Sequence, residues 1–230
     1  MKFGKKTAFA ALVAASALVF AGCAGGGDVI EEGSGGDGGS GDGEMYIAMV
    51  SKGFQHQFWQ AVKKGAEQKA EELGVRITFE GPAAETEIAQ QLEMLTAAID
   101  KNPDAIAYAA LDPEACVAPL EQAKSKDIPV VYFDAPCDGD VGLSLSATDS
   151  KVAGALAAEH MADLIGGSGE VAIVGHSQIN STGVERRDGF VEKIEADYPD
   201  IEIVDIQYGD GDHLKSCLLY TSDAADEGLG

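Results

Sequence analysis

Basic residues are scarce in this chain, and their scarcity excludes one class of partner. The 230 residues include 39 Asp and Glu but only 16 Lys and Arg, and the formal net charge is −23. Proteins that bind nucleic acid need clustered Lys and Arg side chains to contact phosphates. We therefore predict no nucleic-acid partner, and we attribute the acidity to solubility.

Motifs of common enzymes are also absent. The chain has no Gly-x-Ser-x-Gly elbow, no phosphate-binding loop and no His-Glu-x-x-His pair, and no Gly-x-Gly-x-x-Gly follows the first expected strand. Its histidines lack metal-ligand spacing; they are His56, His160, His176 and His213. We therefore predict a protein that is not an enzyme and that holds no cofactor and no metal.

The N-terminus has the pattern of an export signal. A basic segment at residues 1–6 precedes an apolar run at residues 7–20, which is too short to span a membrane comfortably. Small residues and Cys23 then close the run, so residues 1–23 resemble a bacterial lipoprotein signal with Cys23 as its lipidated residue. An ordinary secretory signal is the alternative. Both predict an extracytoplasmic protein, either lipid-anchored to the cell membrane or periplasmic.

Residues 24–44 are predicted to be a disordered linker. Glycine dominates this segment, which has six acidic residues and no basic ones. It cannot bury enough apolar surface to fold, and its like charges keep it extended.

The C-terminal residues form a segment that we expect to be foreign to the protein. Residues 217–226 back-translate to a sequence that resembles the transposase adapter of sequencing libraries, read in frame. We therefore expect residues 217–230 to be a non-native tail and the chain to be a fragment. A genuine C-terminal tail is the alternative.

Between these ends, apolar strands alternate with amphipathic helices. The expected strands are residues 46–50, 76–80, 105–110, 129–134, 142–146, 170–175 and 201–208, and the expected helices are residues 59–73, 87–101, 113–126, 149–165 and 183–198. This alternation predicts an α/β fold built from right-handed βαβ units with parallel sheets. Five strands end before residue 147, and a new series follows. We therefore expect two Rossmann-like lobes, residues 45–147 and an incomplete lobe at residues 148–216.

Two helix ends carry local signals. Gly74 follows the stripe of the first helix as a C-terminal stop, and Thr86 precedes the second as an N-cap. Both helices are expected to pack an apolar stripe on the first sheet.

The segment between the first strand and the first helix suggests a ligand site. It carries the adjacent aromatics Phe58 and Trp59, with Gln55 and His56 beside them. Open α/β sheets bind ligands at the carboxyl ends of their strands, and aromatic faces suit rings with apolar C–H faces and hydroxyl edges. The alternative is that the two aromatics only pack the start of the helix.

Two charged residues are further candidates. Asp134 ends a hydrophobic strand, where its carboxylate could accept hydrogen bonds from hydroxyl groups or instead cap the next turn. Arg186 follows a loop after the sixth strand, so its guanidinium could reach a cleft from the second lobe. An arginine on a helix is usually solvated, and we assign that role to Arg187.

Several segments together resemble one family. They are the Phe58-Trp59 pair, Pro103–Ile106, Ile128–Asp134, Thr148-Asp149 and Glu185–Phe190, in this order. Residues 46–216 resemble the periplasmic sugar-binding proteins of ABC importers, in the group of ribose, galactose and autoinducer-2 binders. The resemblance implies two lobes that close on a sugar, and a monomer that delivers it to a membrane permease. A ligand sensor for a chemoreceptor or sensor kinase, and an autoinducer-2 binder, are the alternatives.

The resemblance also extends the set of site residues. Lys52 matches a lysine of the autoinducer-2 binders, whereas the position of Arg186 favours the sugar binders. Thr148, Ser177 and Gln178 lie at strand ends that face the same cleft. Ala135 stands where the ribose binders carry an arginine, which puts ribose itself in doubt.

Cys116 and Cys137 are the thiols left once Cys23 and the tail are set aside. They follow neighbouring strands, and disulfides persist in exported proteins, so we expect them to pair. The alternative is two small buried side chains.

Overall fold

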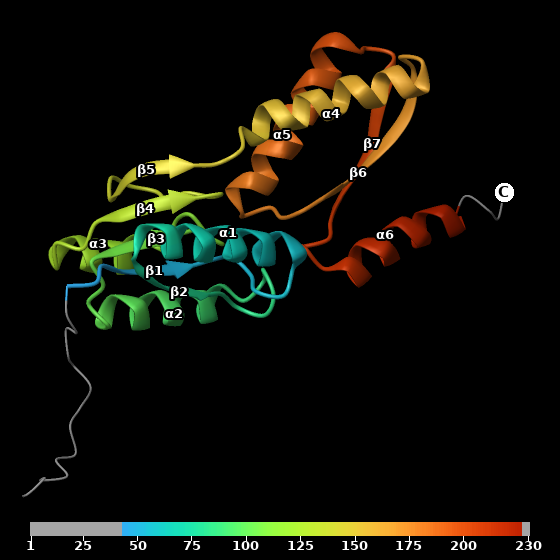
Figure 1. Ribbon diagram of the computed structural model, residues 1–230. Helices are drawn as coiled ribbons and strands as arrows, with labels where there is room; N and C mark the ends of the chain where they lie inside the picture. Colours follow the sequence, from blue (N-terminus) through green and yellow to red (C-terminus); the bar gives the residue numbers. More distant parts are fainter. Residues whose placement is uncertain (1–42, 227–230) are drawn as a thin grey trace, which may run out of the picture. The chain divides into compact units, whose positions relative to one another are not determined.

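The computed structural model describes residues 43–226 (Figure 1). The expected signal with Cys23, almost all of the linker and the last four residues lie outside the described residues. Strands and helices alternate along the described part. In chain order they are β1 (Tyr46–Val50), α1 (Gln57–Leu73), β2 (Arg76–Glu80), α2 (Ile88–Asp100), β3 (Ala105–Tyr108), α3 (Val117–Ser125), β4 (Val130–Phe133), β5 (Gly142–Ser146), α4 (Ser150–Ile165), β6 (Gly169–Gly175), α5 (Ser181–Asp197), β7 (Ile201–Tyr208) and α6 (His213–Asp226).

The first lobe is a five-stranded parallel sheet in the order β2-β1-β3-β4-β5. Alternate residues of β1, β3 and β4 point to one face, because side chains in a strand alternate with a period of two. On that face Val50, Ile106 and Val130 pack with Leu95 of α2 and Leu120 of α3 into one buried core. This core holds the strand ends in place around the site.

The second lobe has only two described strands, β6 and β7, which pair in parallel. Its helices α4 and α5 cross very closely. A Cβ atom added to Gly154 would lie 2.1 Å from the Arg186 carbonyl oxygen, and one added to Gly189 would lie 2.0 Å from that of Lys151. The two glycines therefore allow backbone-to-backbone contact, which larger residues would prevent. Several large apolar side chains stay exposed on this lobe, among them Leu156, Leu164 and Val174.

The expected α/β fold with two lobes is confirmed, and four of the seven strands have the expected bounds. Strands β3 and β4 are shorter than expected, because Asp134 at the end of β4 takes a left-handed φ of 63° and β3 ends at Tyr108. Helix α3 starts at Val117 instead of residue 113. A turn precedes it, in which the Asp112 carboxylate accepts hydrogen bonds from two backbone N–H groups.

The two predicted caps had different outcomes. Gly74 ends α1 in the left-handed conformation, with φ 64°, as expected. Thr86 as the cap of α2 was wrong. Glu87 holds the N-cap position without a side-chain cap bond, and its carboxylate accepts from the backbone N–H of Ala84.

Three further features bear on the predicted segments. Cys116 and Cys137 are joined by a disulfide, with Cα atoms 6.0 Å apart. Helix α6 runs across Ser216, the expected end of the native sequence. Within residues 43–226, every helix is too short or too polar to traverse a lipid bilayer.

Candidate ligand-binding site

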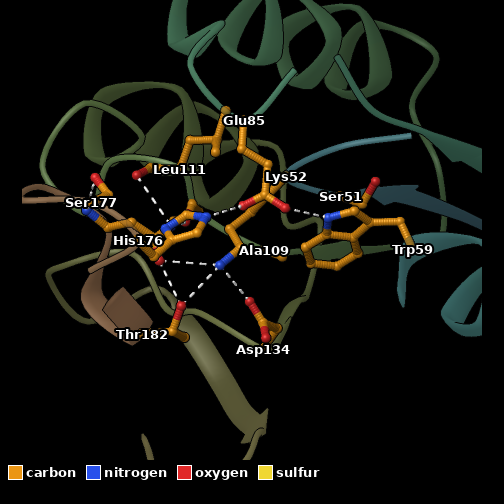
Figure 2. Close-up of polar contacts among 12 residues, drawn as sticks. Ser51, Lys52, Trp59, Glu85, Ala109, Leu111, Asp134, His176, Ser177 and Thr182 are labelled. Atoms are coloured by element: carbon orange, nitrogen blue, oxygen red, sulfur yellow. Dashed lines mark hydrogen bonds and ion pairs between the residues drawn. The ribbon is translucent and has the colours of Figure 1, made fainter. Parts of the chain in front are cut away.

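A buried lysine lies at the centre of the candidate site. Lys52 follows β1, and its ammonium lies 2.7 Å from Asp134 Oδ2 in an ion pair (Figure 2). It also donates to Asn180 Oδ1 and Thr182 Oγ1, both at 3.1 Å. An ammonium has three N–H donors. Two of them are used in these hydrogen bonds, and the contact with Asp134 is an ion pair whose Oδ2 accepts no hydrogen bond from a described residue. Lys52 thus joins residues of both lobes in one polar cluster.

Asp134 reaches the cluster through an unusual backbone conformation. Its φ of 63° lies in the left-handed region, which Asp tolerates better than most residues. Its backbone N–H donates to the Ser146 carbonyl of the neighbouring strand. This turn at the end of β4 directs the carboxylate to Lys52. The charge of the lysine compensates for the partial burial of the carboxylate.

The two aromatic residues occupy different environments. Trp59 is buried, with 1% of its surface exposed, whereas Phe58 is 47% exposed. The Trp59 ring packs edge to face with Phe58 and Phe133, and the Lys52 ammonium lies 5.7 Å from its centroid. The buried Trp59 ring therefore packs beside the lysine, and a ligand could reach its face only if these contacts moved.

Glu85 connects this aromatic group to the second lobe. Its Oε1 accepts from Trp59 Nε1 at 2.7 Å, and its Oε2 lies 3.1 Å from His176 Nε2 (Figure 2). Burial alone would raise the pKa of this carboxyl group. The hydrogen bond from His176, the charge of Lys52 and the Trp59 N–H outweigh burial and lower the pKa to about 2. Glu85 is therefore ionised at neutral pH.

The other predicted site residues lie at a distance from the lysine cluster. Gln55 and His56 are exposed and line a cleft of about 1340 Å³ together with Glu85 and part of α6. His56 accepts the backbone N–H of Phe58 and stacks on His213. The side chains of Thr148, Gln178 and Arg186 are exposed and make no hydrogen bond to another described residue.

Arg187 was expected to be solvated, and this was wrong. Its side chain is partly buried, with 24% exposed, and Nη1 donates to the Tyr208 hydroxyl at 2.9 Å. The Asp188 carboxylate accepts from its Nε. Arg187 therefore ties α5 to β7 inside the second lobe.

Sequence reasoning missed several residues that hold the site together: Glu85, Gln91, His176, Asn180 and Thr182. Ser177 and Gln178 were considered as site residues, but the contact to Lys52 comes from Asn180, the N-cap of α5, and from Thr182. The sequence offered one signal, a run of polar residues between the end of β6 and the start of α5. Such a run indicates where a site lies, but it does not show which side chain makes the contact. Glu85 lies in a loop whose course no periodic pattern predicts.

The chain matches the family model described as periplasmic binding protein domain over residues 47–216. It is 32% identical over 183 residues to the D-allose-binding periplasmic protein of Escherichia coli K12, covering 76% of this chain and 58% of that protein. It is 26% identical over 147 residues to the ribose import binding protein of Bacillus subtilis, covering 64% of this chain and 48% of that protein.

Solved structures show the same similarity. A carbohydrate transporter solute binding protein from Agrobacterium radiobacter, in complex with D-arabinose, has a TM-score of 0.77 and 26% identity, covering 80% of this chain and 63% of that one. A sugar-binding protein of an ABC transporter from Bacillus halodurans has a TM-score of 0.69 and 33% identity, covering 80% and 62%. The chain thus spans about half the length of the curated relatives it matches.

Proposed function

We propose that the whole protein captures a sugar between its lobes and delivers it to an import permease. The premise is that this chain belongs to the periplasmic binding proteins that serve sugar ABC importers. The observation that supports this most directly is the Lys52 cluster. Asp134 comes from the first lobe and Asn180 and Thr182 from the second, and all three contact one ammonium. A ligand at this point would contact both lobes at once.

The chemistry of the cluster suits a neutral molecule with many hydroxyl groups. A carboxylate accepts two hydroxyl hydrogen bonds, an amide both donates and accepts, and an ammonium donates. Phe133, half-buried directly before Asp134 and packed on Trp59, adds apolar surface for the C–H face of a ring. Because Asp134, Asn180 and Thr182 already surround the Lys52 ammonium, a ligand must replace part of this internal network.

The family is extracytoplasmic, and the finer placement is part of our proposal. We propose that Cys23 is lipidated, that the linker at residues 24–44 separates the anchor from the lobes, and that the protein acts as a monomer without catalysis. We also propose that residues 217–230 are not native. The family match ends at residue 216, which supports this boundary.

Ligand binding by the protein from the uninterrupted gene tests the proposal. A thermal-shift screen against pentoses, hexoses and autoinducer-2 identifies the ligand, and titration calorimetry then compares variants. Asp134→Asn and Trp59→Ala should each weaken binding roughly ten- to a hundredfold, since each removes a charge-assisted acceptor or an apolar face.

Asp127→Asn is the matched control for Asp134→Asn. Asp127 also has a left-handed φ, 57°, but it is exposed and precedes β4 instead of following it. Its variant should bind as the wild type does. Unchanged affinity in both site variants would remove Asp134 and Trp59 from the site, and a lack of any sugar ligand would favour a sensor of another molecule.

A further inference from the structure

The loop between β2 and α2 carries one carboxylate that contacts both lobes, Glu85. We propose that Glu85 is a positioning residue: it holds the Trp59 indole in one orientation and couples that orientation to the second lobe through His176 (Figure 2). This inference rests on the proposed function only where it concerns sugar affinity. The contacts of Glu85 with Trp59 and His176 do not depend on that function.

On the side of the first lobe, Glu85 is the hydrogen-bond partner of a buried donor. Trp59 has only 1% of its surface exposed, and its single polar atom, Nε1, donates to Glu85 Oε1. An indole N–H is a donor with no acceptor capacity. Rotation of the ring away from Glu85 would leave that donor buried without an acceptor, which is unfavourable. The carboxylate therefore selects one orientation of the ring between Phe58 and Phe133.

On the side of the second lobe, Glu85 is the partner of an imidazole. His176 follows β6, and its Nε2 contacts Glu85 Oε2 at 3.1 Å. The other ring nitrogen, Nδ1, is buried without a hydrogen-bond partner among the residues that the structure describes. Gly211, after β7, packs against the same two residues. A Cβ atom there would lie 3.0 Å from His176 Nε2 and 3.7 Å from Glu85 Cβ.

The two contacts use different oxygens of the same carboxylate, so they can exist together and each restricts the other. Separation of the lobes would break the contact of Glu85 with His176 and free the carboxylate to move. The Trp59 ring would then lose its fixed partner. Because Lys52 lies over that ring, the same movement would change the polar cluster with Asp134. Trp59 thus responds to the relative position of the lobes.

The chain contains one tryptophan, so its fluorescence reports Trp59 alone. We would measure emission maximum and acrylamide quenching in the 230-residue protein and in Glu85→Ala, Glu85→Gln and His176→Ala. Glu85→Ala should shift the emission to the red and raise the quenching constant about twofold or more, because the ring gains freedom and contact with water. Glu85→Gln should restore most of the wild-type signal, since its amide oxygen can still accept from the indole.

His176→Ala tests the coupling between the lobes. It removes no contact of Trp59, so a change in quenching in the same direction as Glu85→Ala supports transmission through Glu85. An unchanged signal in a folded His176→Ala protein would overturn the coupling. An unchanged signal in Glu85→Ala would overturn the positioning role. Where Glu85→Ala does not fold, Glu85→Met, which fills similar space without an oxygen acceptor, takes its place, and an unchanged signal there would overturn the role equally.

Two controls match these variants. Glu87→Ala removes a carboxylate two residues away whose partner is the Ala84 N–H, and His160→Ala removes an exposed histidine of α4. Neither should change the Trp59 signal. In the protein from the uninterrupted gene, Glu85→Ala should also weaken sugar binding about tenfold. Unchanged affinity there would overturn the role in binding, whereas a wild type that binds no sugar but shows the fluorescence changes would overturn only the proposed function.

Discussion

The two lobes are built from the same alternation of strand and helix, yet they differ sharply in how much core they form. The first lobe buries a cluster of 17 residues between its sheet and helices, whereas the corresponding cluster of the second lobe, among the described residues, has four. Within residues 43–226, the first sheet has five strands and the second has two. A βαβ unit buries its apolar faces only when further strands and helices extend the sheet, so local pattern alone does not produce a core.

Hydrogen exchange on the 230-residue protein should give the largest contrast between the lobes. We expect backbone amides of β1, β3 and β4 to exchange about 10⁴-fold more slowly than those of β6 and β7, since local stability follows buried apolar contacts. Mass spectrometry of peptides from both lobes measures this directly. Equal protection in the two lobes would show that the second lobe is stable with its two described strands, and it would refute the argument from core size.

Gln91 is the residue whose loss should most damage the first lobe. It is fully buried, and its amide makes four hydrogen bonds, donating to the carbonyls of Ser51 and Ala109 and accepting from the Tyr108 hydroxyl and the Leu111 N–H. Gln91→Leu leaves these groups buried without partners and should lower the free energy of unfolding by about 3–4 kcal/mol. Urea denaturation followed by Trp59 fluorescence measures the loss.

Gln90→Leu is the control for this substitution, because Gln90 is exposed on the same helix. Its effect should stay within about 0.5 kcal/mol. If the two variants were equally stable, the buried network would not be a determinant of the first lobe.

The close crossing of α4 and α5 should be the most sensitive point of the second lobe. Gly154→Ala places a methyl group against the Arg186 carbonyl and should destabilise this lobe by about 2 kcal/mol through overpacking. Gly65→Ala in α1 is the matched change, since Gly65 lies in a helix with open space around it. There alanine should stabilise the first lobe by about 0.5–1 kcal/mol. Hydrogen-exchange rates of α5 amides report the effect of Gly154→Ala, and those of α1 amides report the effect of Gly65→Ala. If both substitutions destabilised the protein, the close contact of α4 with α5 would not explain the effect of Gly154→Ala.

Lowering the pH should have the smallest effect on stability, and it should act at the contact of Glu85 with His176 between the lobes. The pKa of Glu85, about 2 in the folded protein, lies below its ordinary value of 4.5. A depressed carboxyl pKa stabilises the folded state above pH 4.5, and this contribution is lost as the pH falls toward 2. Glu85→Gln does not titrate, so the stability difference between wild type and variant should shrink by about 1–2 kcal/mol over this range. A difference independent of pH between 6 and 2 would exclude Glu85 as its source.

Much of the fold could be predicted because its signals are local. The bounds of β1, β2, β5 and β7 followed from apolar runs, and the stop at Gly74 followed from the freedom of glycine in the left-handed region. The cap of α2 could not be predicted, because Thr86 and Glu87 are adjacent polar residues and only the local hydrogen bonds decide between them. The start of α3 could not be predicted either, because the Asp112 carboxylate forms a turn ahead of the helix.

The site divides in the same way. Trp59 and Asp134 were predicted because each lies beside a recognisable helix start or strand end, whereas Lys52 was predicted through the family resemblance. The structure brings these three residues together. Phe58 was predicted with Trp59 as one aromatic platform, but the first turn of α1 directs one ring inward and the other to solvent. Arg186, Thr148 and Gln178 stay predictions, as do Gln55 and His56.

The sequence by itself determined the alternation of strands and helices, the membership of a family and the strand ends where a ligand would bind, since all of these are written in short-range patterns of apolar and polar residues. Only the tertiary structure decided that Lys52 would meet Asn180 and Thr182, and that Glu85 would lie between Trp59 and His176. These pairs are separated by between 26 and 130 positions along the chain. Their contacts depend on how whole lobes pack, because burial makes the pairing of charges and donors obligatory only after the chain has folded.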